Sequence, residues 1–192
     1  LYMSLASLKS ISIMQTPPEG RFPVHITVQK RNEKVMQEAI EKELLRKGQV
    51  YYLHNRIGTI ALVKKQLERL VPKARIGIVH GRLRERELIE VMDDFKNRAY
   101  DVLVATTIIE NGLDLPNVNT LIVEDATKLG LSQAYQIRGR VGRSHTESFA
   151  YFLHGAKLRG KTKLRLQALS QAGALGSGYR IALRDMEIRG AG

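Results

Sequence analysis

Six short β-prone runs, separated by helical or turn-rich stretches, constrain this 192-residue chain more than any other feature. Several of the runs are continuously apolar, as strands of a parallel sheet are when helices cover both faces. The runs are FPVHITV (22–28), QVYYLH (49–54), RIGIVH (75–80), DVLVAT (101–106), NTLIVED (119–125) and SFAYFLH (148–154). Strands that alternate with helices predict right-handed crossovers and an α/β fold with about six parallel strands.

Three of the intervals between these runs carry apolar residues at helical spacing. Such a stripe predicts an amphipathic helix that buries one face in the core. The stripes contain Met36, Ile40 and Leu44, then Ile60, Val63, Leu67 and Leu70, then Leu88, Val91, Met92 and Phe95. Gly48 and Pro72 follow the first two stripes and mark the expected helix ends.

Turn-rich stretches divide the chain into three expected parts. TPPEGRFP (16–23) precedes the first strand, and GALGSG (173–178) separates two short helical stretches near the end. We therefore expect a lead-in over residues 1–21, one α/β domain over 22–156, and a helical hairpin with a loop over 157–192.

The positive charge of the chain is concentrated near its end. The net charge is +12, and residues 128–192 hold 12 Lys and Arg against 3 Asp and Glu. A concentrated basic segment is typical of a protein that binds a polyanion, although an ordinary basic surface gives the same count. The chain has no cysteine and no apolar run near the length of a membrane span, so we expect a cytoplasmic location, no membrane partner and no metal site.

GAKLRGKT (155–162) matches the phosphate-loop pattern G-x-x-x-x-G-K-[ST] at every fixed position. In a true phosphate loop, Lys161 and Thr162 would serve the phosphates and Mg²⁺. Such an enzyme also needs a later strand that supplies an acidic Mg²⁺ ligand, but only 30 residues follow Thr162 and none of them forms a clear strand ending in Asp. We therefore expect a false match, and a basic surface loop formed by Lys157, Arg159, Lys161 and Lys163.

QIRGRVGR (136–143) carries the sharpest chemical signal. Gln136, Arg140 and Arg143 stand at spacings of four and three, so a helix through this stretch would project all three from one face. Gly139 and Gly142 would allow close approach to a polyphosphate, and guanidinium groups stabilise the charge of a phosphoryl group in transfer. An exposed basic helix turn is the alternative interpretation.

ATTIIENGLDLPN (105–117) directly follows a predicted strand. The hydroxyl of Thr106 or Thr107 and the nearby backbone N–H groups suit a phosphate, and Asp114 suits a ribose hydroxyl. Taken alone, the stretch is also ordinary turn chemistry.

In this order, these stretches resemble the second RecA-like domain of superfamily 2 helicases and translocases. QVYYLHNR resembles motif IV, RIGIVHGRL motif IVa, ATTIIENGLD motif V and QIRGRVGR motif VI. Asn111 departs from the pattern, because many members carry Arg before the motif V glycine. LGSGYRIALRDMEIRGAG (175–192) is similar to the TRG motif that RecG-type helicases share with bacterial transcription-repair coupling factors. Its residues resemble those of the coupling factors more closely.

The resemblance implies a role for each matching residue. Arg140 and Arg143 would be catalytic arginine fingers, and the nucleotide would meet Gln136, Gly139, Gly112 and Asp114. The DNA backbone would meet Asn55, His80, Gly81, Arg82 and Thr106. The residues that couple closure of the nucleotide cleft to the duplex would be Arg184, Asp185 and Arg189.

The resemblance also implies an activity. Coupling factors are ATP-dependent translocases of double-stranded DNA that displace stalled RNA polymerase and recruit excision-repair proteins. ATP and Mg²⁺ would lie between this lobe and a preceding one, from which residues 1–21 lead in. Because the chain has neither an acidic D-E-x-x box nor a phosphate loop in the expected place, we expect it to bind no nucleotide tightly and to hydrolyse none alone. A RecG-type fork helicase and a non-catalytic DNA-binding module are the alternatives.

Overall fold

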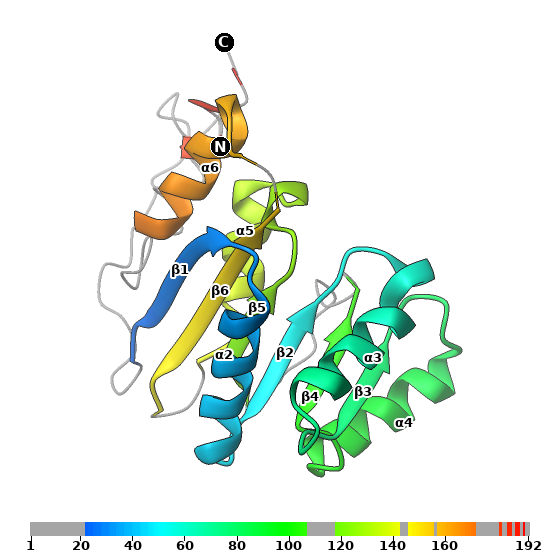
Figure 1. Ribbon diagram of the computed structural model, residues 1–192. Helices are drawn as coiled ribbons and strands as arrows, with labels where there is room; N and C mark the ends of the chain where they lie inside the picture. Colours follow the sequence, from blue (N-terminus) through cyan, green and yellow to red (C-terminus); the bar gives the residue numbers. More distant parts are fainter. Residues whose placement is uncertain are drawn as a thin grey trace, which may run out of the picture.

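The computed structural model describes residues 22–106, 118–142, 146–155, 157–171, 181, 184, 185, 187, 188 and 190. Its strands are β1 (Val24–Lys30), β2 (Gln49–Leu53), β3 (Ile76–Val79), β4 (Val102–Ala105), β5 (Val118–Val123) and β6 (Ser148–His154). They form one sheet in the order β1-β6-β5-β2-β4-β3 (Figure 1). Every neighbouring pair is parallel, which confirms the fold class predicted from the apolar runs.

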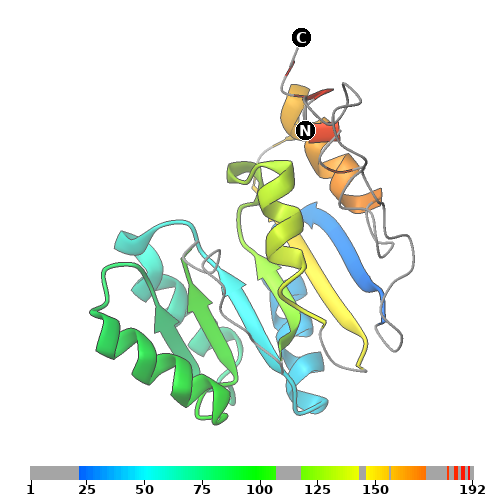
Figure 2. The same cartoon turned by 180° about the vertical axis from the view of Figure 1, so that it is seen from behind.

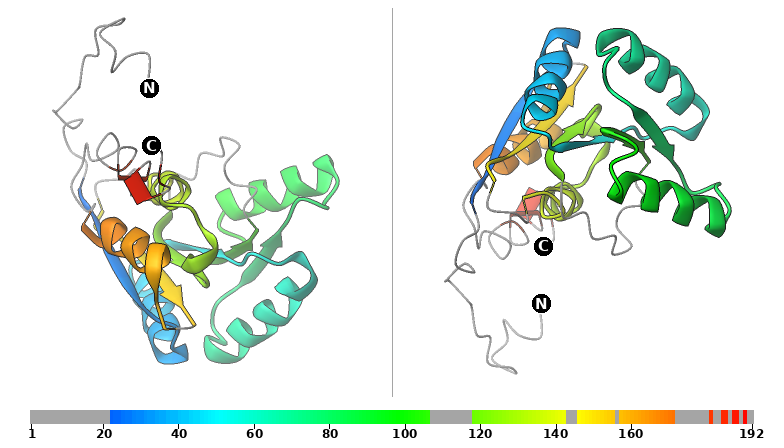
Figure 3. Two further views of the ribbon diagram at one scale, coloured as in Figure 1. Left: turned by 90° about the horizontal axis from the view of Figure 1, so that it is seen from above. Right: turned by 90° about the horizontal axis from the view of Figure 1, so that it is seen from below.

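Helices cover both faces of the sheet. They are α2 (Glu33–Leu45), α3 (Ile60–Leu70), α4 (Glu85–Lys96), α5 (Leu131–Arg138) and α6 (Gly160–Gln171), with short 3₁₀ helices η1 (Ile57–Thr59) and η3 (Ala126–Lys128). On one face, α2 and α3 bury Met36, Ile40 and Leu67 against the sheet. On the other face lie α4, α5 and α6 (Figures 2 and 3). Their apolar side chains contribute to a second buried cluster.

Helix α2 is held at both ends by side chains near its termini. The side chain of Asn32 accepts a hydrogen bond from the backbone N–H of Lys34 at the start of α2. At the other end, the backbone N–H of Gly48 donates to the carbonyl of Glu43, 3.0 Å away. The Glu43 side chain is fully buried, and its carboxylate accepts from the Thr120 hydroxyl of β5 at 2.6 Å and pairs with Arg46. This buried carboxylate ties α2 to the middle of the sheet.

The segment after α5 departs from the predicted helix. We expected one helix to carry residues 136 to 143, but α5 ends at Arg138 and the chain continues in turns. The backbone N–H of Gly142 donates to the carbonyl of Val118 at 3.3 Å, and Gly142 has a left-handed φ of +77°. A Cβ atom at Gly142 would lie 2.9 Å from the Ser148 hydroxyl, so the close approach to β6 and the backbone angle both require glycine.

The end of the chain packs beside α5. Leu166 and Leu169 of α6 share a buried cluster with Ile181 and Ile188, and the described residues between 181 and 188 are helical. Helix α6 lies within residues 157–192, where we expected a helical hairpin, and GALGSG lies outside the described residues. Among the helices of the described part, none has both the length and the apolar character that crossing a membrane requires.

The phosphate-loop match spans the connection from β6 to α6. Lys161 is exposed, and the Thr162 hydroxyl lies 3.3 Å from a guanidinium nitrogen of Arg165. A cation at that hydroxyl disfavours a Mg²⁺ ion in the same place, because both are positive. Lys157, Arg159, Lys161 and Lys163 are all exposed, but only Lys157 and Arg159 lie in the expected basic loop, because Lys161 and Lys163 belong to the first turn of α6.

Candidate functional site

The carboxyl ends of β2, β4 and β3 bring together the residues that we expected to face DNA. Asn55 follows β2, Thr106 follows β4 and His80 follows β3, and these three strands are neighbours in the sheet. The pairing extends past the strand ends, because the backbone N–H of Thr106 donates to the carbonyl of Val79 at 3.3 Å. Gly81 and Arg82 form an exposed turn directly after His80. Thr106 itself is only 6% exposed.

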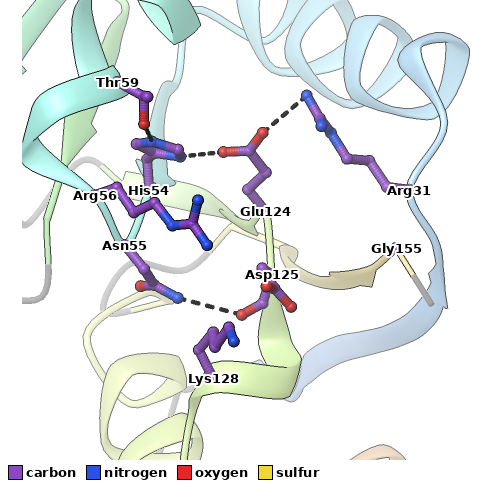
Figure 4. Close-up of a pocket in the computed structure, with 9 residues that line it drawn as sticks. All are labelled: Arg31, His54, Asn55, Arg56, Thr59, Glu124, Asp125, Lys128 and Gly155. Carbon is purple, nitrogen blue, oxygen red and sulfur yellow. Dashed lines mark hydrogen bonds and ion pairs between the residues drawn. The ribbon is translucent and has the colours of Figure 1, made fainter.

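A pocket of about 270 Å³ opens at the same edge of the sheet, over the ends of β1, β6, β5 and β2 (Figure 4). Parallel α/β sheets place ligands at this edge, since the loops that follow the strands converge there. The pocket is lined by Arg31, His54, Asn55, Arg56, Thr59, Glu124, Asp125, Lys128 and Gly155.

Glu124 organises the inner wall of this pocket. One carboxylate oxygen lies 2.8 Å from the Arg31 guanidinium, and the other meets Nδ1 of His54. Because a carboxylate only accepts hydrogen bonds, Nδ1 carries a proton, and the other ring nitrogen lies 2.7 Å from the Thr59 hydroxyl. The Glu124 side chain is 10% exposed, so these partners replace the water that it loses.

Asp125 shapes the outer wall. Its carboxylate accepts from the backbone N–H of Thr127 at 3.2 Å and from the hydroxyl of the same residue, which caps η3. Its carbonyl accepts from the side-chain amide of Asn55 at 3.3 Å. The hydrogen bond from Asn55 to Asp125 therefore joins the ends of β2 and β5.

Tyr52 lies buried behind this pocket. Burial raises the pKa of its hydroxyl far above the ordinary value, and the negative charge of Glu124 raises it further, while Arg31 lowers it. The hydroxyl lies 3.3 Å from the sulfur of Met36. Tyr52 therefore remains a neutral phenol and contributes packing to the wall of the site.

Three cations of the pocket, Arg31, Arg56 and Lys128, were not among the predicted site residues. Arg56 and Lys128 are exposed, and Figure 4 shows both head groups turned toward the pocket. Within the described ranges neither has an ion pair or a hydrogen bond from its side chain. The position of Arg56 directly after Asn55 in QVYYLHNR is a signal that sequence reasoning missed. Lys128 is separated from that stretch by 72 positions and gives no such signal.

The residues expected to meet the nucleotide lie near the carboxyl end of α5. Gln136 is exposed on the last turn of the helix, Gly139 caps it, and Arg140 follows half-buried. Since Gly142 bonds to Val118, the first residue of β5, this segment reaches the amino edge of the sheet. The structure brings Gln136, Gly139 and Arg140 together there, away from the pocket. The remaining predicted residues, Gly112, Asp114 and Arg143, lie outside the described residues.

The TRG segment docks on the helix that leads to Arg140. Asp185 is 4% exposed, and its carboxylate accepts from the hydroxyl of Ser132 in the first turn of α5 at 2.7 Å. Arg184 is exposed and pairs with Glu187 at 2.8 Å. Asp185 is therefore buried against α5, whereas Arg184 lies on the solvent-exposed side of the segment. Arg189 lies outside the described residues.

Known proteins resemble this chain in sequence and in structure. The family described as helicase conserved C-terminal domain matches residues 30–145. Over its whole length, the chain is 51% identical to the transcription-repair-coupling factors of Staphylococcus epidermidis and Staphylococcus aureus. It spans 17% of the length of each of these relatives.

Solved structures show the same fold. A RecG protein bound to a three-way DNA junction matches 93% of this chain and 24% of its own, with a TM-score of 0.77 and 31% identity. Domain 2 of a DEAD-box helicase bound to an RNA duplex matches 78% of this chain and 60% of its own, with a TM-score of 0.59 and 17% identity. The second likeness concerns the fold alone. Because the family match covers more than half of the residues, the chain belongs to the helicase conserved C-terminal domain family.

Proposed function

We propose that this chain is the C-terminal motor lobe of an ATP-dependent translocase of double-stranded DNA. The whole protein would displace stalled RNA polymerase and couple transcription to nucleotide excision repair in the bacterial cytoplasm. The observation that carries the proposal is the 51% identity to transcription-repair-coupling factors over the full chain. RNA polymerase and the excision-repair proteins would be bound by other parts of the whole protein.

The geometry supports separate sites for DNA and for the nucleotide at the two edges of the sheet. In this proposal, the carboxyl edge with Asn55, His80 and Arg82 contacts the DNA backbone. Arg140 and Arg143 reach the γ-phosphate of an ATP·Mg²⁺ that a partner lobe holds, with Gln136, Gly139, Gly112 and Asp114 along the nucleotide. Arginine fingers of this kind contribute about 10³–10⁵ in rate. The isolated chain would hydrolyse no ATP, because the groups that bind Mg²⁺ and position the nucleotide belong to the other lobe.

The buried contact between Ser132 and Asp185 supports the coupling role of the TRG segment. It joins the TRG helix to α5, whose other end leads to Arg140. A shift of the TRG segment would therefore move the helix that positions the arginine finger. Arg184 and Arg189 lie in the same segment and would face the duplex.

The decisive experiment replaces Arg140 by Ala in the full-length protein. We expect DNA-stimulated ATP hydrolysis to fall by about 10³-fold or more, because a charge that stabilises the transition state is removed. Displacement of a stalled polymerase would be lost with it, while binding of duplex DNA would remain. Steady-state ATPase assays and a polymerase-displacement assay measure both effects.

Lys161→Ala is the matched control, since Lys161 belongs to the phosphate-loop match. The proposed motor keeps its ATP hydrolysis in this variant, whereas a phosphate-loop enzyme loses Mg·ATP binding. Retention of full ATPase activity by Arg140→Ala would contradict the proposal. It would leave a non-catalytic DNA-binding module as the better interpretation.

A RecG-type fork helicase is the second candidate. The likeness to RecG on a three-way DNA junction, with a TM-score of 0.77 over 93% of this chain, favours it. Both candidates share the motor chemistry and differ in substrate. Removal of stalled polymerase without regression of model forks supports the coupling factor, and the reverse supports the RecG-type enzyme.

A further inference from the structure

The pocket at the carboxyl edge contains two cations that have no counter-charge among the described residues. Arg31 is 2.8 Å from Glu124 and is therefore neutralised. Arg56 and Lys128 come from different strand ends, one after β2 and one at the end of η3, and both face the pocket (Figure 4). Among the residues that the structure describes, neither is paired. Two converging cations of this kind attract an anion.

The acidic groups of the pocket do not cancel this attraction. Both oxygens of Glu124 are engaged, one by Arg31 and one by His54. The carboxylate of Asp125 accepts from the neutral N–H and hydroxyl of Thr127 and keeps its charge, but the three cations Arg31, Arg56 and Lys128 still outnumber the two carboxylates of the lining. The head groups of Arg56 and Lys128 therefore determine which ligand the mouth of the pocket accepts.

The chemistry of the lining favours a phosphodiester over a free nucleotide. A nucleotide site requires an apolar or aromatic surface for the base. Apart from His54, whose two ring nitrogens are occupied, the described residues that line the pocket include no aromatic and no aliphatic side chain. A duplex needs no such surface, because its bases remain stacked inside while its phosphates face outward.

The pocket is continuous with other basic positions along the same edge. Gly155 at its rim begins the connection that carries the exposed Lys157 and Arg159. The carbonyl of Thr127, next to Lys128, accepts from Arg165 of α6 at 3.3 Å, which joins η3 to the basic helix. Positive charge therefore extends from the end of β2 to the start of α6.

We propose that Arg56 and Lys128 together bind one backbone phosphate of duplex DNA in this pocket. The site rests on the proposed function and deepens it, because it gives the DNA path one contact after β2 and one on η3, in addition to those at His80, Gly81 and Arg82. The hydrogen bond from Asn55 to the carbonyl of Asp125 holds the two sides of the clamp at a fixed separation. The contact reads no base and is independent of sequence.

The test measures binding of the full-length protein to a labelled duplex by fluorescence anisotropy across a range of salt concentrations, without nucleotide. Each lost phosphate contact lowers the slope of log affinity against log salt by about 0.9, which is about eightfold in affinity at 0.1 M salt. We expect this result for Arg56→Gln and for Lys128→Gln on duplexes of unrelated sequence. Lys128→Arg retains the charge and should bind within about twofold of the wild type.

Lys73→Gln is the matched control for loss of one positive charge. Lys73 is exposed in the turn before β3, at the opposite edge of the sheet, and should change affinity less than about twofold. The proposal is overturned if the two pocket variants show the same salt slope as Lys73→Gln. It is also overturned if they raise the KM for ATP and leave duplex affinity unchanged, since the pocket would then serve the nucleotide. A wild-type protein that binds no duplex would instead refute the proposed function.

Discussion

Glu43 carries a negative charge in a place where its side chain is completely buried. Burial of an unpaired carboxylate is costly, and here Thr120 and Arg46 supply the hydrogen bonds that offset it. The same arrangement fixes the residue at position 48, because the carboxylate occupies the space that a side chain there would need. A Cβ atom on Gly48 would lie 1.7 Å from a Glu43 oxygen.

Gly48→Ala is therefore expected to destabilise the protein by about 2–3 kcal/mol, through overpacking and the loss of hydrogen bonds to Glu43. The midpoint of urea denaturation measures the effect. Gly58→Ala is the control, because a Cβ atom at Gly58 meets nothing within 4 Å. Its free energy of unfolding should stay within about 0.5 kcal/mol of the wild type. Equal losses in the two variants would show that the space around Glu43 does not decide the outcome.

At the scale of elements, one ion pair pins the start of β3 to the start of β4. Asp101 accepts from the backbone N–H of Arg75 at 2.9 Å and from two guanidinium nitrogens at 3.0 and 2.8 Å. Partial burial raises the pKa of Asp101, but the hydrogen bonds and the charge of Arg75 outweigh it, so the pKa lies below the ordinary value. The pair therefore contributes stability above the pKa of the unfolded state, near pH 4, and this is lost as the pH falls through the folded pKa.

Asp101→Asn should lower the free energy of unfolding by about 1 kcal/mol at pH 7, since Arg75 is more than half exposed and solvent screens the pair. The difference from the wild type should shrink as the pH falls below about 4. Denaturation curves at pH 7 and pH 3 measure it. Asp93→Asn, which removes an exposed and longer pair with Lys96 at 3.8 Å, should have little effect at either pH. A difference that stays constant with pH would contradict the assignment.

The elements differ in how far the sequence predicts them. All six strands lie where the apolar runs indicate, because a buried parallel strand needs a continuous apolar stretch. The prediction of one helix through QIRGRVGR is wrong, because Gly142 must adopt a left-handed φ and approach β6 closely. The pocket was incompletely predicted for another reason. His54 and Glu124 are 70 positions apart, and only the strand order brings them together.

At the scale of the molecule, a buried hydrogen bond joins α5 to the TRG segment. The hydroxyl of Ser132 donates to the buried Asp185 at 2.7 Å, and such a bond to a charged group contributes about 1.5–3 kcal/mol. In the full-length protein, Ser132→Ala should therefore lower polymerase displacement per ATP hydrolysed by about tenfold, while ATP hydrolysis itself stays within about threefold. Parallel displacement and ATPase assays measure the ratio.

Ser170→Ala is the control for loss of the Ser132–Asp185 contact, because Ser170 is exposed on α6 and its hydroxyl donates to the carbonyl of Gln167. It should leave both activities unchanged. If Ser132→Ala reduces hydrolysis and displacement by the same factor, the contact supports α5 alone and does not couple the TRG segment to the motor.

The pairing of β1 with β6 joins the first strand of the sheet to the last. Val24 lies opposite Ser148, 124 positions later in the chain. During synthesis at about 5–20 residues per second, β1 would leave the ribosome roughly 6–25 seconds before β6 exists. Since β6 is its neighbour in the sheet, the first strand spends that interval without its partner. Chaperones that shield unpaired strand edges would therefore matter most for this lobe while it is still attached to the ribosome.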